Sequence, residues 1–328
     1  MDKADLFKTL SLPGIDVETD AIKKEVWAIG GGKGGTGKTF LSANLGVALA
    51  RTGKKVLLVD ADLGCANLHT CLGVNPEVTL SDYIQGKVDR IEDVLIQTEI
   101  PNLALISGAY HYLEISNPKY SQKMKFIRKI HDLDFEYIIL DLGAGTSYTN
   151  LDFFLSANLG ILNVIPEPTS IENTYSFIKS TFYRRFKKVA RDPEVRDIVT
   201  TAIDEKNKRG IRTPHDLIDY IDTLDKKTGQ RLKETIYSFS PKLIVNQVRS
   251  KDDITLGFSM RSSCLKYFGI KVDYVGSIEY DDHVWRATKK KRPLLLEYPA
   301  SRAARSVERA VTNLLKKEEL KFDLILRT

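Results

Sequence analysis

The stretch Gly32-Lys33-Gly34-Gly35-Thr36-Gly37-Lys38-Thr39 decides the fold of this 328-residue chain. A hydrophobic run at 26–29 precedes it, and residues 40–51 after it carry apolar side chains at helical spacing. In such a strand–loop–helix setting, glycines let backbone N–H groups turn inward, where these donors and the helix N-terminus hold phosphate oxygens. We therefore predict a phosphate-binding loop (P-loop) whose nucleotide contacts come from Gly32, Gly34, Gly35, Thr36, Gly37, Lys38, Thr39 and Phe40.

Three residues of this pattern have specific chemical roles in phosphoryl transfer. Lys38 is expected to bind the β- and γ-phosphates, and the Thr39 hydroxyl is expected to ligate Mg²⁺. A second hydrophobic run at 137–141 ends in Asp141 and is followed by a glycine-containing loop that includes Gly143. Because Mg²⁺ keeps several waters and takes few protein carboxylates, Asp141 is predicted to hold it through water or through the Thr39 hydroxyl, with Gly143 in a mobile switch loop.

Two more carboxylates follow the strand predicted at 56–60. Asp60 ends the strand and Asp62 lies two residues on, where the chain turns and both side chains can approach the site. Phosphoryl transfer depends on an oriented water and a charge clamp more than on covalent chemistry, and the resemblance given below implies that Asp62 is the catalytic and metal-site residue of the pair. The alternative is that these acids only cap a helix.

Asn246 ends the hydrophobic run at 243–247. A carboxamide both donates and accepts hydrogen bonds, so Asn246 can recognise the edge of a base; the alternative is an ordinary strand-end cap.

Strand-length apolar runs recur along the chain with helical segments between them, at 26–30, 56–60, 103–106, 137–141, 161–165, 243–247 and 274–278. Most are continuous rather than alternating, as in strands buried on both faces. The pattern predicts an α/β fold with a mainly parallel, twisted sheet of about seven or eight strands and helices on both faces. The motifs fall at the carboxyl ends of strands, where such sheets bind ligands.

The segment between 165 and 243 is too long for one crossover helix. We predict a helical insertion at about 182–240, with breaks near Gly210 and Pro214. Residues 184–191 contain Arg184, Arg185, Lys187, Lys188 and Arg191 and no acid. Such a cluster either contacts phosphates or is a solvated face.

Composition limits which functional classes the protein can belong to. The net charge of +6 permits anionic partners without requiring them, and the hydrophobic content of 42% is that of a globular protein. Cys65, Cys71 and Cys264 form no CxxC pair, which argues against a disulfide framework and fits a reducing cytoplasm. The polar start of the chain is not a signal peptide, and no run of 18 apolar residues exists.

The K-G-G-T-G-K-T pattern resembles the deviant Walker A loop of the MinD/ParA family, within the SIMIBI class of P-loop NTPases. The resemblance implies ATP and Mg²⁺ as ligands, and it implies an ATP-dependent homodimer in which Lys33 reaches the partner's nucleotide. It places Asp60, Asp62 and Asn67 in a D-x-D-x-G-x-x-N switch, with Asp62 positioning the attacking water. It also implies adenine recognition by Asn246 and by the loop that contains Glu279 and Asp281.

Two further segments resemble the FlhG/FleN branch of this family, the flagellar-number ATPases. They are the P-E-P-T-S run at 166–170 and the region from 280 to 304. Residues 2–8 loosely match the D-Q-A-x-x-L-R segment with which such proteins stimulate the GTPase FlhF. MinD and FlhG proteins usually end in an amphipathic membrane helix, but here the apolar face of 302–317 is expected to pack on the domain, and residues 316–328 form a tail with weak potential for membrane contact.

These expectations define an N-terminal extension at 1–24, an ATPase domain at 25–315 and a tail at 316–328. The predicted function is a dimerising ATPase switch in the cytoplasm, with peripheral membrane contact at most, that positions or numbers a cellular structure such as the flagellum with help from a partner protein. The alternative is a ParA-like partition ATPase that binds nonspecific DNA through its basic insertion. An iron–sulfur carrier is disfavoured because the cysteines lack the required pattern.

Overall fold

A computed structural model describes residues 24–108, 120–190, 192–205 and 210–320. Its centre is an eight-stranded sheet in the order β3-β4-β2-β5-β1-β6-β7-β8. The strands are β1 (Glu25–Gly30), β2 (Val56–Asp60), β3 (Ile96–Gln97), β4 (Leu103–Ile106), β5 (Tyr137–Asp141), β6 (Leu159–Val164), β7 (Lys242–Val248) and β8 (Asp273–Glu279). Among the strands of the described residues, only the β3–β4 pair is antiparallel. The predicted parallel α/β fold is confirmed.

Alternate residues of each central strand face two separate hydrophobic cores. In β1, Val26 and Ala28 pack into one core, and Trp27 and Ile29 pack into the other; all four are at most 1% exposed. Burial on both faces explains why the strand sequences are continuously apolar. The sequence analysis missed β3, because its two residues are too few to give a pattern.

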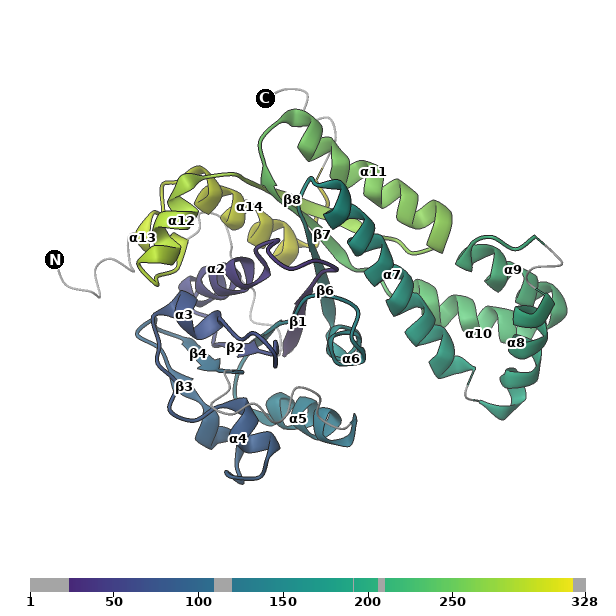
Figure 1. Ribbon diagram of the computed structural model, residues 1–328, viewed down its shortest axis with the longest axis horizontal. Helices are drawn as coiled ribbons and strands as arrows, with labels where there is room; N and C mark the ends of the chain where they lie inside the picture. Colours follow the sequence, from purple (N-terminus) through teal and green to yellow (C-terminus); the bar gives the residue numbers. More distant parts are fainter. Residues whose placement is uncertain (1–23, 109–119, 191, 206–209, 321–328) are drawn as a thin grey trace.

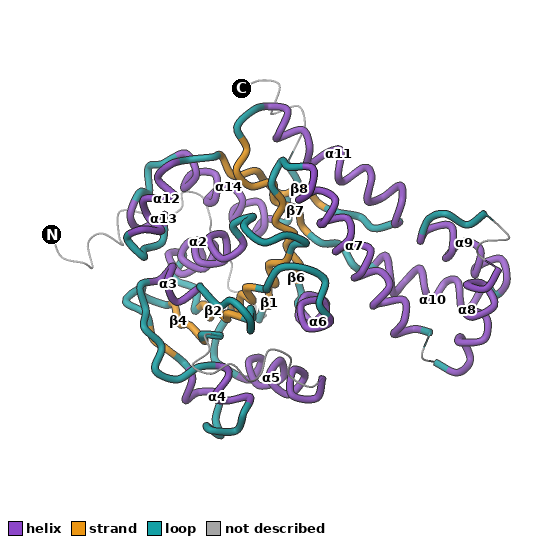
Figure 2. Tube along the Cα trace, in the orientation of Figure 1, coloured by secondary structure: helices purple, strands orange, loops and turns teal. Residues whose placement is uncertain are grey.

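Helices cover both faces of the sheet (Figure 1; Figure 2). They are α2 (Lys38–Arg51), α3 (Leu68–Leu72), α4 (Leu80–Ile84), η1 (Ile91–Val94), α5 (Tyr120–Asp132), α6 (Tyr148–Ser156), α7 (Pro168–Val189), α8 (Pro193–Glu205), α9 (Pro214–Leu224), α10 (Lys226–Tyr237), α11 (Lys251–Phe268), α12 (Asp282–Lys289), α13 (Leu294–Glu297) and α14 (Arg302–Lys316). Helices α2 and α14 pack on one core, and α6, α7 and α11 pack on the other. No helix within the described ranges is long and apolar enough to cross a bilayer.

The chain between β6 and β7 forms the four helices α7 to α10, of which α8, α9 and α10 extend beyond the sheet (Figure 1). The predicted helical character is confirmed, although the predicted boundary at 182 lies inside the 22-residue helix α7. Thr213 caps α9 in a reciprocal capping box with Asp216, and Pro214 occupies its first turn. Gly210 has a φ of 65°, which a glycine adopts without strain.

Helix α14 buries the apolar face predicted for it. Val307, Ala310 and Val311 are at most 1% exposed, and they pack against the core shared with α2. This face is therefore part of the domain and is not available to lipid. The predictions for residues 1–23 and for most of the tail, 321–328, lie outside the described residues.

Phe154 of α6 joins the sheet to the helical segment. Its ring packs edge-on against the ring of Phe177 in α7, with 5.0 Å between the ring centroids. It packs in the same way against Phe239, which follows α10, with 5.9 Å between the centroids. It also fills the space above Gly160 of β6, where an added Cβ would lie 2.5 Å from the ring. One buried ring thus holds three elements together.

We expect Phe154→Ala to lower the free energy of unfolding by about 3–5 kcal/mol, because the substitution leaves a cavity that the surrounding elements only partly fill. Urea denaturation followed by circular dichroism measures the change. Tyr148→Ala on the same helix is the control: its ring is 65% exposed, so its loss should cost less than about 1 kcal/mol. Equal effects of the two substitutions would contradict the role given to Phe154.

Candidate functional site

The strand order places the predicted motifs side by side. Strands β2, β5 and β1 are neighbours, with Asp60 in register with Asp141 and Asp141 in register with Ile29. The P-loop leaves the end of β1 and enters α2, so its backbone lies beside both carboxylates. The prediction that these motifs meet at the carboxyl edge of the sheet is confirmed.

The P-loop is shaped to leave its inner surface open. Gly37, the N-cap of α2, has a φ of 88°, and Gly35 has a φ of 76° with no atom within 4 Å of an added Cβ. The Lys38 ammonium donates to the Lys33 carbonyl at 3.1 Å, so its side chain curls back over the loop. Burial lowers the Lys38 pKa, and the charges of Asp141 and Asp62 oppose that shift. A glycine-rich loop at a helix N-terminus with a lysine curled over it fits a phosphate chain.

Asp141 lies directly behind the first turn of α2. It accepts a hydrogen bond from the Ser42 hydroxyl at 2.8 Å, and the neighbouring Thr39 hydroxyl also lowers its pKa. Its side chain is 1% exposed, and burial raises its pKa to about 6 despite those donors. A hydroxyl and a carboxylate in contact at the end of a P-loop are the oxygen donors that Mg²⁺ uses, with waters completing the shell.

Asp60 and Asp62 differ in their surroundings. Asp60 is fully buried, accepts from the backbone N–H groups of Leu68 (2.9 Å) and Asp62 (3.2 Å), and has its pKa raised well above the usual range, chiefly by burial. It therefore fixes the chain after β2 and does not face solvent. Asp62 is half-buried, and its Oδ1 accepts from the N–H groups of Gly64 and Cys65 at 3.2 and 3.1 Å.

Asp62 also lies against the second predicted switch segment. A Cβ added at Gly143 would be 3.0 Å from its Oδ1, so a larger residue at 143 would require the Asp62 side chain to shift. Asn150 of α6 donates to the carbonyls of Gly143, Ala144 and Gly145 at 3.0–3.2 Å. The structure thus brings Asp62, Gly143 and the P-loop together. Asn67 is exposed, and its amide donates to the Cys65 carbonyl.

Lys33 points away from the loop that carries it. Its ammonium is 2.7 Å from Oε2 of Glu167 and 2.9 Å from the Thr169 hydroxyl, both at the N-terminus of α7. The Lys33 and Glu167 side chains are 34% and 54% exposed, so the ion pair lies at the surface. The P-E-P-T-S run noted in the sequence therefore contacts the P-loop.

The residues expected to bind adenine make other contacts in this structure. The Asn246 amide donates to the Thr36 carbonyl at 2.8 Å, and its oxygen accepts from the Gln247 N–H. Asp281 caps α12 and accepts from the Ala303 N–H, and Glu279 lies 3.4 Å from Arg309. Phe40 is half-buried against the core beside α2. Asn246 therefore supports the P-loop, and Asp281 supports a helix, whatever further contacts they make with a base.

Asn163 and Ser42 also belong to the site, although no motif in the sequence pointed to them. Asn163 of β6 is fully buried, and its amide donates to the Thr36 carbonyl at 2.9 Å, while its Oδ1 has no hydrogen-bond partner among the described residues. Two carboxamides, from β6 and β7, thus hold the same P-loop carbonyl. The sequence did contain a signal for Asn163, because it is a single amide inside the otherwise apolar strand LGILNV. An unpaired buried amide is costly, so such a residue is expected to have a hydrogen-bond partner.

The cysteines do not form a ligand set. Burial raises the pKa of the Cys71 thiol to about 11 and that of Cys264 to about 12, which disfavours the thiolate form that metals bind. Within the described ranges, no three His, Cys, Asp or Glu side chains cluster closely enough to hold a metal ion. The metal site suggested here depends instead on one carboxylate, a hydroxyl and water.

This geometry defines a P-loop protein, and comparison with known proteins identifies its family. Residues 27–294 match the CobQ/CobB/MinD/ParA nucleotide binding domain, so the chain belongs to that family. Among curated proteins it is similar to the antiactivator FleN of Pseudomonas aeruginosa, with 36% identity over 157 residues, which are 47% of this chain and 55% of FleN. It is also similar to the flagellum site-determining protein YlxH of Helicobacter pylori, with 31% identity over 163 residues, or 46% and 52% of the two chains.

These matches confirm the predicted resemblance to the MinD/ParA family and its FlhG/FleN branch. The chain spans about half the length of these curated relatives. The fold is shared over most of the chain with MinD of Pyrococcus horikoshii, solved with Mg-ADP, at 23% identity and a TM-score of 0.58 over 90% of this chain and 97% of that one. A ParA family ATPase from Chlorobium tepidum gives a TM-score of 0.59 at 18% identity, covering 90% and 100%.

We expect Asn163→Ala to weaken nucleotide binding about tenfold, because the substitution frees the Thr36 carbonyl from one of its two amide donors and loosens the loop. Titration with a fluorescent ADP analogue measures the affinity. Asn313→Ala is the matched control, since it also removes an amide donor to a backbone carbonyl, that of Val275, but on the β8–α14 side of the protein. Wild-type affinity in Asn163→Ala would contradict the supporting role of this residue.

Proposed function

We propose that this protein is a Mg²⁺-dependent ATPase that dimerises with ATP and separates after hydrolysis to ADP and phosphate. The observation that carries the proposal is the convergence of Lys38, Asp62 and the Thr39–Asp141 pair at one edge of the sheet. These are the groups required to neutralise phosphate charge, hold a metal and orient a water. Membership of a nucleotide-binding family supports the same conclusion.

Each side chain has a distinct role in this mechanism. Lys38 binds the β- and γ-phosphates, where its charge opposes the negative charge that develops in the transition state. Thr39 and Asp141 hold Mg²⁺, directly or through water, and the metal supplies further charge neutralisation when it is bound. Asp62, fixed by two backbone N–H groups beside Gly143, orients the attacking water.

Lys33 is proposed to act in the partner subunit. Its half-exposed side chain leaves the P-loop and is held at the surface by Glu167 and Thr169. From there the ammonium is accessible to a second copy and not directed to the phosphate cradle of its own chain. In the dimer, the Lys33 ammonium would leave Glu167 and bind the nucleotide held by the partner subunit. Dimerisation would then depend on ATP.

We propose that the switch positions or numbers a cellular structure such as the flagellum, and that it acts in the cytoplasm with a protein partner, for which an FlhF-like GTPase is a candidate. The similarity to YlxH, a flagellum site-determining protein, supports a flagellar role. The MinD fold also occurs in a MinC:MinD complex of Aquifex aeolicus, which supports a protein partner. The segment predicted to contact FlhF, at 2–8, and residues 321–328 of the tail, for which membrane contact was predicted, lie outside the described residues.

The alternative of DNA binding through the basic segment is weaker. Arg184 makes a bidentate contact with Asp152 at 2.7–2.9 Å, and Arg185 donates to the Thr235 carbonyl. Two of the five cations that suggested phosphate contacts therefore stabilise helix packing.

The solution mass of the protein in ADP·Mg²⁺ and in ATP·Mg²⁺ tests the switch. We expect a dimer only with ATP. Asp62→Ala should prolong the dimer, because loss of an oriented water slows hydrolysis by about a hundredfold or more. Lys33→Ala should remain monomeric with ATP while still binding it. Light scattering measures the solution mass, and phosphate release measures the rate of hydrolysis. A mass that does not change with the nucleotide, in protein shown to bind ATP, would refute the proposal.

The Lys33–Glu167 ion pair should oppose dimerisation, because it occupies the ammonium in the monomer. We expect Glu167→Gln to raise the ATP-dependent dimerisation constant up to about fivefold, since exposed ion pairs contribute at most about 1 kcal/mol. Sedimentation equilibrium with Asp62→Ala in the background measures the constant. Glu172→Gln, an exposed acid further along α7, is the control; a fall in dimerisation for Glu167→Gln would show that this glutamate aids assembly instead.

A further inference from the structure

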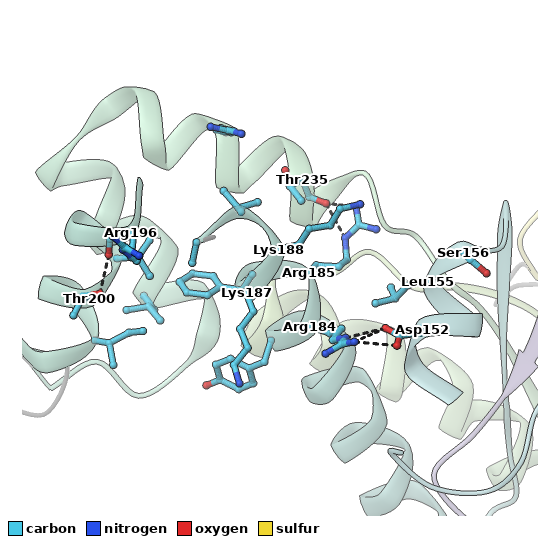
Figure 3. Close-up of a pocket in the computed structure, with 18 residues that line it drawn as sticks. Asp152, Leu155, Ser156, Arg184, Arg185, Lys187, Lys188, Arg196, Thr200 and Thr235 are labelled. Atoms are coloured by element: carbon cyan, nitrogen blue, oxygen red, sulfur yellow. Dashed lines mark hydrogen bonds and ion pairs between the residues drawn. The ribbon is translucent and has the colours of Figure 1, made fainter. Parts of the chain in front are cut away.

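A groove lies on the side of the molecule formed by the helical segment (Figure 3). Its volume is about 890 Å³, and its walls come from α6, α7, α8, α9 and α10. None of its lining residues belongs to the nucleotide site described above. A concavity of this volume is in the range of built binding sites.

The floor of the groove is apolar. Leu155 of α6 is half-buried, and Ile203 of α8 is 49% exposed, although isoleucine is usually buried. Phe186, Val199 and Leu217 also line the groove, but they are at most 3% exposed. The apolar surface that a partner could contact is therefore that of Leu155 and Ile203, and it favours an apolar partner face.

The charges around this floor are almost all positive. The lining contains one acid, Asp152, and the six basic residues Arg184, Arg185, Lys187, Lys188, Arg196 and Arg231. Three of the bases are engaged by the protein: Arg184 by Asp152, Arg185 by the Thr235 carbonyl and the Ser238 hydroxyl, and Arg231 by Asp192.

The remaining three cations are exposed. Lys187, Lys188 and Arg196 have no ion-pair partner among the side chains that the structure describes. Figure 3 shows that they lie apart around the groove, the lysines on α7 and the arginine on α8. Because they do not converge on one point, they match several separated negative charges and not a single phosphate.

We propose that this groove is the docking site for an acidic amphipathic helix of a partner protein. Leucine-like side chains on one face of that helix would contact Leu155 and Ile203, and its flanking carboxylates would face Lys187, Lys188 and Arg196. Recognition of a helix by an apolar groove with charges at its rim is a common mode of peptide binding. The charge of the rim selects acidic partners and excludes basic ones.

Nucleic acid fits the groove less well. Phosphates would engage the three cations, but they gain nothing from the aliphatic floor at Leu155 and Ile203. The only aromatic rings in the lining are Tyr183 and Phe186, and Phe186 is 2% exposed and cannot stack on a base. The apolar floor therefore favours protein.

The groove is also joined to the nucleotide site by two helices. The N-terminal part of α6 holds the loop at Gly143 through Asn150, and the N-terminus of α7 holds Lys33 through Glu167. Further along the same helices, the Arg184–Asp152 pair forms one wall of the groove. A partner seated there would contact the two helices that also touch the P-loop and its neighbouring switch segment.

Fluorescence anisotropy of the full-length protein with two labelled peptides tests the proposal. The first is a helix of about 16 residues with leucines at i, i+3, i+4 and i+7 and glutamates on both flanks. The second has the same composition with the leucines distributed around the helix. Titrations are made in ADP·Mg²⁺, so that the result does not depend on whether ATP drives dimerisation. We expect the first peptide to bind at least tenfold more tightly, with affinity falling as salt rises.

Two variants locate the binding site. Lys187→Glu with Lys188→Glu reverses two rim charges and should weaken the first peptide about tenfold or more, and Ile203→Asp should do the same by placing a charge on the floor. All three side chains are exposed, so both variants should fold, which circular dichroism checks. The matched control is Lys226→Glu with Lys227→Glu, an equal charge reversal at exposed positions of α10 outside the groove, and it should bind as the wild type does.

Three results would overturn the proposal. The first is equal affinity for the two peptides, which would indicate nonspecific charge attraction. The second is wild-type affinity in both groove variants. The third is tighter binding of a short DNA duplex that is lost in the lysine variant and unchanged in Ile203→Asp, which would make the groove a phosphate-binding surface.

Discussion

The contact between Asp141 and the first turn of α2 is the interaction on which the site depends. A fully buried carboxylate is costly unless donors satisfy it, and here the Ser42 hydroxyl donates to it, with the Thr39 hydroxyl nearby. Because Asp141 ends β5 and the hydroxyls begin α2, the same contact fixes the P-loop relative to the neighbouring strand. A structural requirement, the satisfaction of a buried charge, thus brings together the oxygen donors that we propose hold Mg²⁺.

On its other side, the P-loop is held by two amide side chains. Asn163 of β6 and Asn246 of β7 both donate to the Thr36 carbonyl, and an added Cβ at Gly37 would lie 2.5 Å from the Asn246 amide. The loop is therefore held between a carboxylate on one side and two carboxamides on the other. This preorganisation lets its N–H groups face phosphates without rearrangement at the moment of binding.

The segments expected to respond to nucleotide are held differently. Asp62 and Gly143 approach each other across the site, and their supports are backbone N–H groups and the single amide of Asn150. Asn150 belongs to α6, which also carries Asp152 in the wall of the groove. The helical segment is thus a structural continuation of the elements next to the nucleotide site, connected to them by the Arg184–Asp152 pair and by Phe154.

The sequence by itself determined the class of fold, the P-loop and the two acidic strand ends, because those features depend on local patterns: continuous apolar runs, glycines at a turn and acids directly after strands. It also predicted the buried face of α14 and the helices of the long segment. Tertiary structure alone decided which long-range partners these residues meet. Three such contacts join residues more than thirty positions apart: Lys33 with Glu167, Asn163 with the Thr36 carbonyl, and Arg184 with Asp152. No local pattern specifies such contacts, because they follow from the order of the strands and the packing of helices upon them.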